Sequence, residues 1–224
     1  MFNLLAENLN FGEGPRWHND KLWFSDFYQH AVLTVDLNGN IEKIVDIPNQ
    51  PSGLGWLPNG DLLIVSMLDR KIMKYSNNVL TLHSDLSELT PFRCNDMVVD
   101  RDGHAYVGNF GSLHHAKDVK PTCLIHIDPD GNANIAARKL DFPNGTVITP
   151  DGKKMIIGET YAGRLTSFDI DADKQLGNRK VWVKLMPTWY YIGVRFALAT
   201  IYLSLIHISE PTRPLYISYA VFCL

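Results

Sequence analysis

One turn pattern recurs four times along the 224 residues of this chain. Its tips are Asn19-Asp20, Asn59-Gly60, Asp102-Gly103 and Asp151-Gly152, and each stands between two runs rich in β-branched, aromatic and aliphatic residues. Asn-Gly and Asp-Gly pairs tolerate the positive φ angles of tight hairpins. Successive tips are 40, 43 and 49 residues apart. A four-stranded propeller blade takes about 40–50 residues, so the spacing predicts a β-propeller.

Within each unit, four strand-like runs are separated by turns, which gives about four four-stranded blades. The predicted first strands are Arg16-Trp17, Gly53-Leu57, Met97-Asp100 and Thr146-Thr149. No helical periodicity is visible in this region, so the fold class is all-β. A β-sandwich is the main alternative, but a sandwich has no reason to repeat one register four times.

A special residue recurs six positions before the first residue of each tip. These positions hold Glu13, Gly53, Asp96 and Gly145, in the segments Gly12-Glu13-Gly14-Pro15, Ser52-Gly53, Asn95-Asp96 and Asn144-Gly145. Equivalent positions of radially arranged repeats meet at one end of the central axis. We therefore expect Glu13, Asn95 and Asn144 to converge in an oxygen-rich site.

Composition bounds the partners and the compartment. The formal net charge is -3 and the isoelectric point is about 6.2, so no basic surface indicates nucleic acid. Three cysteines, Cys94, Cys123 and Cys223, form no spaced motif, which is typical of a reducing compartment. The N-terminal residues carry no signal-peptide pattern. A cytoplasmic location without a membrane partner is predicted.

The chain changes character after about Val183. Residues 184–224 contain one glycine, Gly193, and no aspartate, although these two residue types mark nearly every earlier turn. The apolar run from Trp189 to Ile208 has no flanking basic cluster, which argues against a membrane helix. Residues 204–224 resemble the conceptual translation of a sequencing-library adapter. We therefore expect a partial propeller over residues 1–183 and a non-native or out-of-frame tail over 184–224.

Four short motifs, in this order and blade phase, carry a family resemblance. They are Glu13-Gly14-Pro15, Leu22-Trp23-Phe24-Ser25-Asp26, Arg93-Cys94-Asn95-Asp96 and Phe142-Pro143-Asn144-Gly145. Residues 3–183 resemble the SMP-30, gluconolactonase and luciferin-regenerating-enzyme family, which includes regucalcin. The resemblance implies a six-bladed parent with one divalent cation at the mouth of the channel, and many members hydrolyse small lactones. Six blades at this spacing need roughly 270 residues.

The resemblance also assigns residues. Glu13 and Asn144 match two metal ligands, and Arg93 and Asn95 match positions that contact the substrate. The family's third protein ligand is an aspartate of the fifth blade, which is also its usual general base, and no residue here matches it. The catalytic base is therefore unassigned, and this 224-residue chain is expected to be inactive and poorly stable by itself.

The chemistry fits the assigned residue types. A hard ion such as Ca²⁺ prefers carboxylate and amide oxygens, and Zn²⁺, Mn²⁺ and Mg²⁺ are the alternatives. Such an ion can polarise a lactone carbonyl, while Arg93 holds a substrate oxygen. The expected partner is a small lactone or sugar acid, and the parent is expected to be a monomer. A non-catalytic propeller that binds calcium or another ligand, and a related ester or organophosphate hydrolase, stay open.

Each candidate also has a purely structural interpretation. Glu13 can be a solvated loop acid, Asn95 and Asn144 can cap turns, and Arg93 can form a surface salt bridge. Asp96 can orient a loop, and Glu159, at the end of a predicted second strand, is better explained as structural than as facing the channel.

Overall fold

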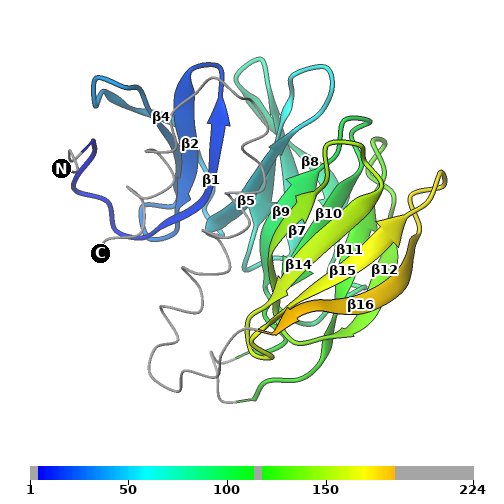
Figure 1. The fold of residues 1–224 in the computed structure, drawn as a ribbon. Coiled ribbons are helices and arrows are strands. Elements are labelled where there is room, and N and C mark those ends of the chain that lie inside the picture. Colours follow the sequence, from blue (N-terminus) through cyan, green and yellow to red (C-terminus); the bar gives the residue numbers. More distant parts are fainter. Residues whose placement is uncertain (1–4, 114–117, 185–224) are drawn as a thin grey trace.

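The computed structural model describes residues 5–113 and 118–184, which form sixteen strands in four antiparallel sheets (Figure 1). Each sheet is a four-stranded meander in which strands that follow one another in the sequence are hydrogen-bonded neighbours. The described part contains no helix. The predicted all-β fold of four four-stranded propeller blades is confirmed.

The strands have the following bounds. The first blade holds β1 (Gly12–His18), β2 (Lys21–Asp26), β3 (Ala31–Val35) and β4 (Ile41–Asp46). The second holds β5 (Pro51–Trp56), β6 (Leu62–Ser66), β7 (Lys71–Ser76) and β8 (Val79–Asp85). The third holds β9 (Cys94–Val99), β10 (Ala105–Asn109), β11 (Thr122–Ile127) and β12 (Ala133–Leu140). The fourth holds β13 (Pro143–Ile148), β14 (Lys154–Glu159), β15 (Arg164–Ile170) and β16 (Leu176–Lys184).

The first strand of each blade lies innermost. β1 contacts β5, β5 contacts β9, and β9 contacts β13. Figure 1 shows the blades following one another from the blue first blade to the yellow and orange fourth. The same end of each inner strand therefore faces the same end of the axis.

Three apolar clusters join neighbouring blades. The first two blades share a cluster that includes Val32, Leu54 and Ile64. The second and third share one that includes Val65 and Met97. Tyr106 and Ile157 lie in the cluster between the third and fourth. Burial of apolar surface stabilises these contacts by roughly 25 cal/mol per Å².

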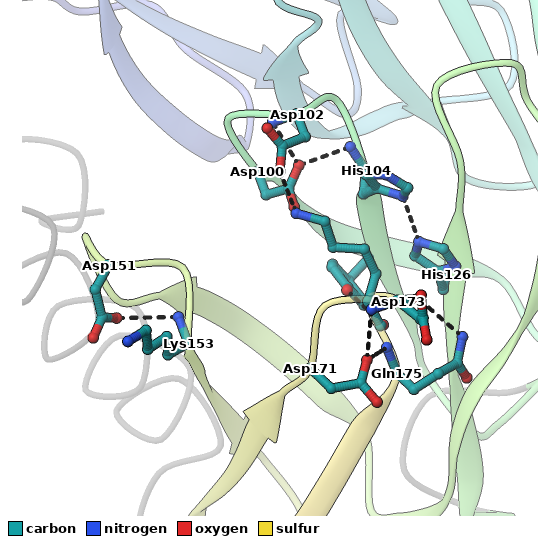
Figure 2. A network of polar contacts seen from close by, with 11 residues as sticks. Asp100, Asp102, His104, His126, Asp151, Lys153, Asp171, Asp173 and Gln175 are labelled. Carbon is teal, nitrogen blue, oxygen red and sulfur yellow. Dashed lines mark hydrogen bonds and ion pairs between the residues drawn. The ribbon is translucent and has the colours of Figure 1, made fainter.

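Polar contacts add a second link between the third and fourth blades, at the hairpin-turn end of the strands. Lys174, in the β15–β16 turn, donates to Asp100 at 2.7 Å and forms an ion pair with Asp102. Beside them the rings of His104 and His126 stack, and their facing nitrogens are 2.9 Å apart (Figure 2). This network links the turns of two blades at the end of the axis opposite to the start of the inner strands.

The inner strands begin two to four residues earlier than the sequence predicted. Pairing with the second strand shows a one-residue irregularity in all four, between Glu13 and Arg16 in β1 and between Asn144 and Thr146 in β13, for example. Each is a β-bulge, which absorbs an extra residue within a paired strand. The Gly, Pro, Asn and Asp residues near these bulges are typical of turns, so the sequence predicted turns there. In the structure they lie inside strands.

The strand pairing also corrects the phase of the repeats. Gly12, Pro51, Cys94 and Pro143 are the residues paired with the last residue of the second strand in their blades. Glu13 is therefore equivalent to Ser52, Asn95 and Asn144, and not to Gly53, Asp96 and Gly145. Counting back from the tips failed because the first hairpin is one residue shorter, with Asn19 and Asp20 alone at φ of 49° and 58° between β1 and β2.

The last described strand, β16, ends at Lys184. The domain boundary at residue 183 stays a prediction. The predicted tail from 185 onward, with the apolar run 189–208, lies outside the described residues. Within residues 5–113 and 118–184, no helix has the length and apolar character needed to cross a bilayer.

Close approach of two blades generates a prediction for Gly108 of β10. A Cβ atom added there would lie 2.2 Å from the Pro143 carbonyl oxygen at the start of β13. Because backbone atoms cannot yield as a flexible side chain can, we expect Gly108→Ala to lower the free energy of unfolding by about 2 kcal/mol or more. Urea denaturation measures it.

Gly177 of β16 is the matched control, because a Cβ atom there meets nothing within 4 Å. Gly177→Ala should change stability by less than about 0.5 kcal/mol. Equal stability of the two variants would contradict the described contact between β10 and β13.

Candidate functional site

A string of buried polar groups crosses all four blades at the start of the inner strands. The Ser25 hydroxyl of the first blade donates to the Ser52 carbonyl of the second at 2.6 Å. Ser52 Oγ donates to Asn95 Oδ1 of the third blade at 3.2 Å. Asn95 Nδ2 donates to Asn144 Oδ1 of the fourth at 2.7 Å. Residues separated by more than a hundred positions in the sequence thus meet in one network.

The two asparagines form the centre of this network. Asn95 and Asn144 are 0% and 3% exposed and lie inside β9 and β13. They bond to each other across two blades, so they do not cap local turns as their residue type alone would suggest. Asn144 Nδ2 is buried and has no hydrogen-bond partner among the described residues.

Glu13 occupies the same strand position in the first blade and is buried, with 8% exposure. Its Oε2 accepts a hydrogen bond from the Gly14 amide at 3.2 Å. Burial, and next the charge of Asp96, raise the pKa of Glu13 to about 7. Because Glu13 is buried, it is not a solvated loop acid. That Glu13 and Asn144 share one cation stays a prediction.

Asp96 forms an ion pair with an arginine that the sequence analysis missed. Arg16 forms an ion pair with Asp96 Oδ1 at 2.9 Å and also donates to the Met97 carbonyl at 2.7 Å. The Met97 amide completes the set by donating to Asp96 at 2.8 Å. Arg16 thereby ties the first blade to the third. No local signal could have revealed this pair, because its members are 80 residues apart.

Arg93 lies directly before β9 and is half-buried. Its carbonyl accepts a hydrogen bond from the Phe110 amide at 3.1 Å, which fixes its backbone two residues from Asn95. This position places Arg93 at the same end of the axis as the asparagines. Its contact with a substrate stays a prediction, as does that of Asn95.

The last residue of each second strand is polar and structural. Asp26, for example, accepts from the Asn10 and Gln29 amides. Glu159 is 1% exposed and accepts from Arg164, Thr166 and the Asp141 amide. Burial alone would raise its pKa, but the hydrogen bonds from Arg164 and Thr166 outweigh burial and lower it. Glu159 is therefore an anchor of the fourth blade, as its structural interpretation held.

An apolar cluster lies directly beyond these strand ends. It is formed by Phe27, Met67 and Phe110, which follow β2, β6 and β10, and by Phe142, which precedes β13, with Tyr161 packed against it. The Phe110 and Phe142 rings are 4.6 Å apart between their centroids. The polar residues of the network are themselves buried, and electrostatic interactions are stronger away from water.

The chemistry of the site is that of oxygen donors. Within residues 5–113 and 118–184, no group of three or more His, Cys, Asp or Glu gathers as a metal cluster would. Cys94, next to Asn95, is fully buried, and burial raises the pKa of its thiol to about 12. Glu13 and Asn144, which the family resemblance assigns as ligands, would offer a carboxylate and an amide oxygen.

Solved structures of several propellers are similar to this one. Regucalcin of Agrobacterium tumefaciens, described as a calcium-binding protein, has a TM-score of 0.67 at 22% identity over 80% of this chain and 61% of its own. A gluconolactonase of Xanthomonas campestris has 0.67 at 22% identity over 80% and 64%. A luciferin-regenerating enzyme has 0.65 at 19% identity over 77% and 60%. At these identities the likeness shows the fold, and the chain spans less than two thirds of each neighbour.

Family membership rests on the sequence. Residues 11–190 match the sequence model of the SMP-30/gluconolactonase/LRE-like region, which covers all four blades. The resemblance carried by the four motifs is therefore confirmed. The chain belongs to the SMP-30/gluconolactonase/LRE-like family.

Proposed function

We propose that the protein is a lactone hydrolase that uses a divalent cation held by Glu13 and Asn144. The observation that carries the proposal is a buried network of polar groups that links the four blades, running from Ser25 of β2 through Ser52 and Asn95 to Asn144. Glu13 holds the strand position in the first blade that Asn144 holds in the fourth. Membership of the family and the similarity to a gluconolactonase support it. The first choice of cation is Ca²⁺, because a carboxylate and an amide oxygen are hard ligands.

The residues fit a cation by their unsatisfied chemistry. Asn144 keeps one end of its amide buried without a partner, which costs about 1–3 kcal/mol. Glu13 is buried, its carboxylate accepts a hydrogen bond from the Gly14 amide, and the charge of Asp96 further disfavours its ionised form. A cation between Glu13 and Asn144 would offset both costs, provided that Asn144 presents its carbonyl oxygen.

Hydrolysis adds one water to the ester. The water oxygen bonds to the carbonyl carbon, the ring C–O bond breaks, and the remaining proton ends on the released hydroxyl. A bound cation supplies polarisation of the carbonyl and stabilises the charge on its oxygen. Arg93 is suited to hold a substrate oxygen in the planar fork of its guanidinium group. The residue that accepts the first proton is unassigned.

A cation-binding propeller without catalysis is the second candidate. Its support is the similar structure described as a calcium-binding protein. Asp96, the second carboxylate near Glu13, is engaged by Arg16 and by the Met97 amide, so it is poorly placed to accept a proton. The two candidates share the cation site and differ in turnover.

The deciding experiment compares this chain with one that continues in its natural downstream reading frame. Hydrolysis of glucono-1,5-lactone is followed by proton release with Ca²⁺, Mn²⁺ or Zn²⁺ and after chelation. We expect cation-dependent turnover by the longer chain and little by the 224-residue chain, because the expected third ligand is absent from the matched blades. If the longer chain binds the cation without hydrolysing the lactone, the second candidate, a non-catalytic binding protein, is favoured. Robust turnover by the 224-residue chain would contradict the expectation that a third ligand from a further blade is required.

Glu13→Gln should have opposite effects on stability and on cation binding. The raised pKa means that the folded chain holds a proton more tightly than the unfolded chain. Wild-type stability therefore falls as pH rises from about 4.5 to about 7, and the loss is complete above that. At pH 8 without cation, we expect the variant to be more stable by on the order of 3 kcal/mol.

The same substitution removes the charged ligand. Thermal melting is measured with and without about 5 mM Ca²⁺, a concentration that suits a weak site. Ca²⁺ should raise the melting temperature of wild type and leave that of Glu13→Gln unchanged. The account is contradicted if Glu13→Gln is less stable than wild type at pH 8 and Ca²⁺ still raises its melting temperature. Glu13 would then be neither an acid whose pKa is raised by burial nor a ligand.

A further inference from the structure

We propose that the protein has a second ligand site, a pocket between the first two blades that takes an uncharged saccharide. The pocket is lined by the turns that follow β1, β5 and β7, at the end of the axis opposite to the start of the inner strands. It is therefore independent of the proposed cation site. Its volume is about 570 Å³, which lies within the range of about 300–1,000 Å³ for small-molecule sites.

The pocket coincides with a short hairpin. In the fourth blade, the turn from 171 to 175 between β15 and β16 is long enough for Lys174 to reach Asp100 in the third blade. The corresponding turn of the second blade, between β7 and β8, holds only Asn77 and Asn78. The space that a long turn fills between the third and fourth blades is therefore open between the first and second.

The short hairpin leaves an aromatic side chain uncovered. Trp23 of β2 and Tyr106 of β10 hold the same strand position, because their partners on the inner strands, at 16 and 98, are equivalent. Tyr106 is fully buried, and its hydroxyl donates to the Lys174 carbonyl of the long turn at 3.0 Å. Trp23 is only half-buried and lines the pocket. A ligand over Trp23 would take the place of the long turn.

Three half-buried aromatic side chains, Trp23, Trp56 and Tyr75, form the apolar part of the pocket wall. They are held in place by their neighbours. The Trp56 ring stacks on the His18 ring with centroids 4.0 Å apart, and Trp23 Nε1 donates to the His18 carbonyl at 3.0 Å. The Tyr75 hydroxyl donates to Asn78 Oδ1 at 3.1 Å. A wall that is already ordered loses little conformational freedom when a ligand binds.

The polar part of the wall decides the chemical class of the ligand. It consists of side-chain amides and one carboxylate, those of Asn19, Asn59, Asn77, Asn78 and Asp61. The described residues that line the pocket include no lysine and no arginine, and burial lowers the pKa of His18, which leaves its imidazole uncharged at neutral pH. An anionic ligand would therefore meet no positive charge in this wall.

A sugar satisfies both parts of the wall. Its hydroxyl groups donate and accept, so they match the two ends of an amide and the oxygens of a carboxylate. The C–H face of its ring can pack on an aromatic ring, as apolar surface does. Aromatic surface with a few well-placed polar groups is the usual composition of a small-molecule site.

A ¹H–¹⁵N spectrum of the 224-residue chain, titrated with methyl β-D-glucopyranoside, tests the proposal. We expect the shifted amides to lie in 18–23, 56–62 and 75–78. Sodium gluconate and choline, an anion and a cation, should leave these amides unshifted. The proposal is overturned if the glucoside shifts no amide, if it shifts those around Arg93 and Asn95 instead, or if choline shifts the pocket amides as strongly as the glucoside does.

Two substitutions locate the site. Trp23→Leu removes the indole but keeps a residue that the fold accepts, since Leu63 holds this strand position in the second blade. Asp61→Ala removes the carboxylate and leaves the aromatic rings in place. We expect each to raise the Kd for the glucoside about tenfold. Melting temperatures without sugar show whether each variant is folded.

Trp182→Leu is the matched control, because Trp182 is 48% exposed on β16 and lies outside the pocket. It should bind the glucoside as wild type does. If Trp182→Leu weakens binding as much as Trp23→Leu, the sugar binds exposed indoles without a specific site. If Asp61→Ala and Trp23→Leu both bind as wild type, the pocket is not a saccharide site.

Discussion

The one-residue bulge near the start of every inner strand is the constraint on which the rest of the structure depends. It lets Gly, Pro, Asn and Asp stay within a paired strand, and it sets which side chains point across the axis. Because the bulge recurs at one position, Glu13, Ser52, Asn95 and Asn144 become equivalent. The buried polar network follows from this equivalence, since the inner strands are in contact.

The close approach of neighbouring blades also brings the polar side chains of the site together. Gly53 and Gly108 let backbone of one blade approach the next, where a Cβ atom would lie only 2.2–2.3 Å from a neighbouring atom. That approach brings Asn95 within hydrogen-bond distance of Asn144 and lets Arg16 reach Asp96. The Asn144 amide nitrogen is buried there without a hydrogen-bond partner among the described residues. Burial of such groups is costly without a compensating ligand.

The sequence predicted the fold because four turn tips are local signals at a regular spacing. It also predicted that Glu13, Asn95 and Asn144 converge, and the structure shows the contact between the two asparagines. The phase was one residue wrong because the hairpin at Asn19-Asp20 is short, and this error hid Ser52. Arg16 was missed because its partner lies 80 residues away. Contacts of this kind depend on how strands pair across the fold, whereas residue patterns carry information only about neighbours along the chain.

The central proposal is that Glu13 and Asn144, at equivalent positions of the first and fourth blades, hold one cation. Paramagnetic broadening by Mn²⁺ in a ¹H–¹⁵N spectrum of the chain tests it most directly. The account predicts that broadening centres on the amides of Glu13, Ser52, Asn95 and Asn144 together, while the hairpin tips at the opposite end of the strands stay sharp. Broadening centred instead on exposed carboxylates, such as those of Asp171 and Asp173 in the β15–β16 turn, would contradict it.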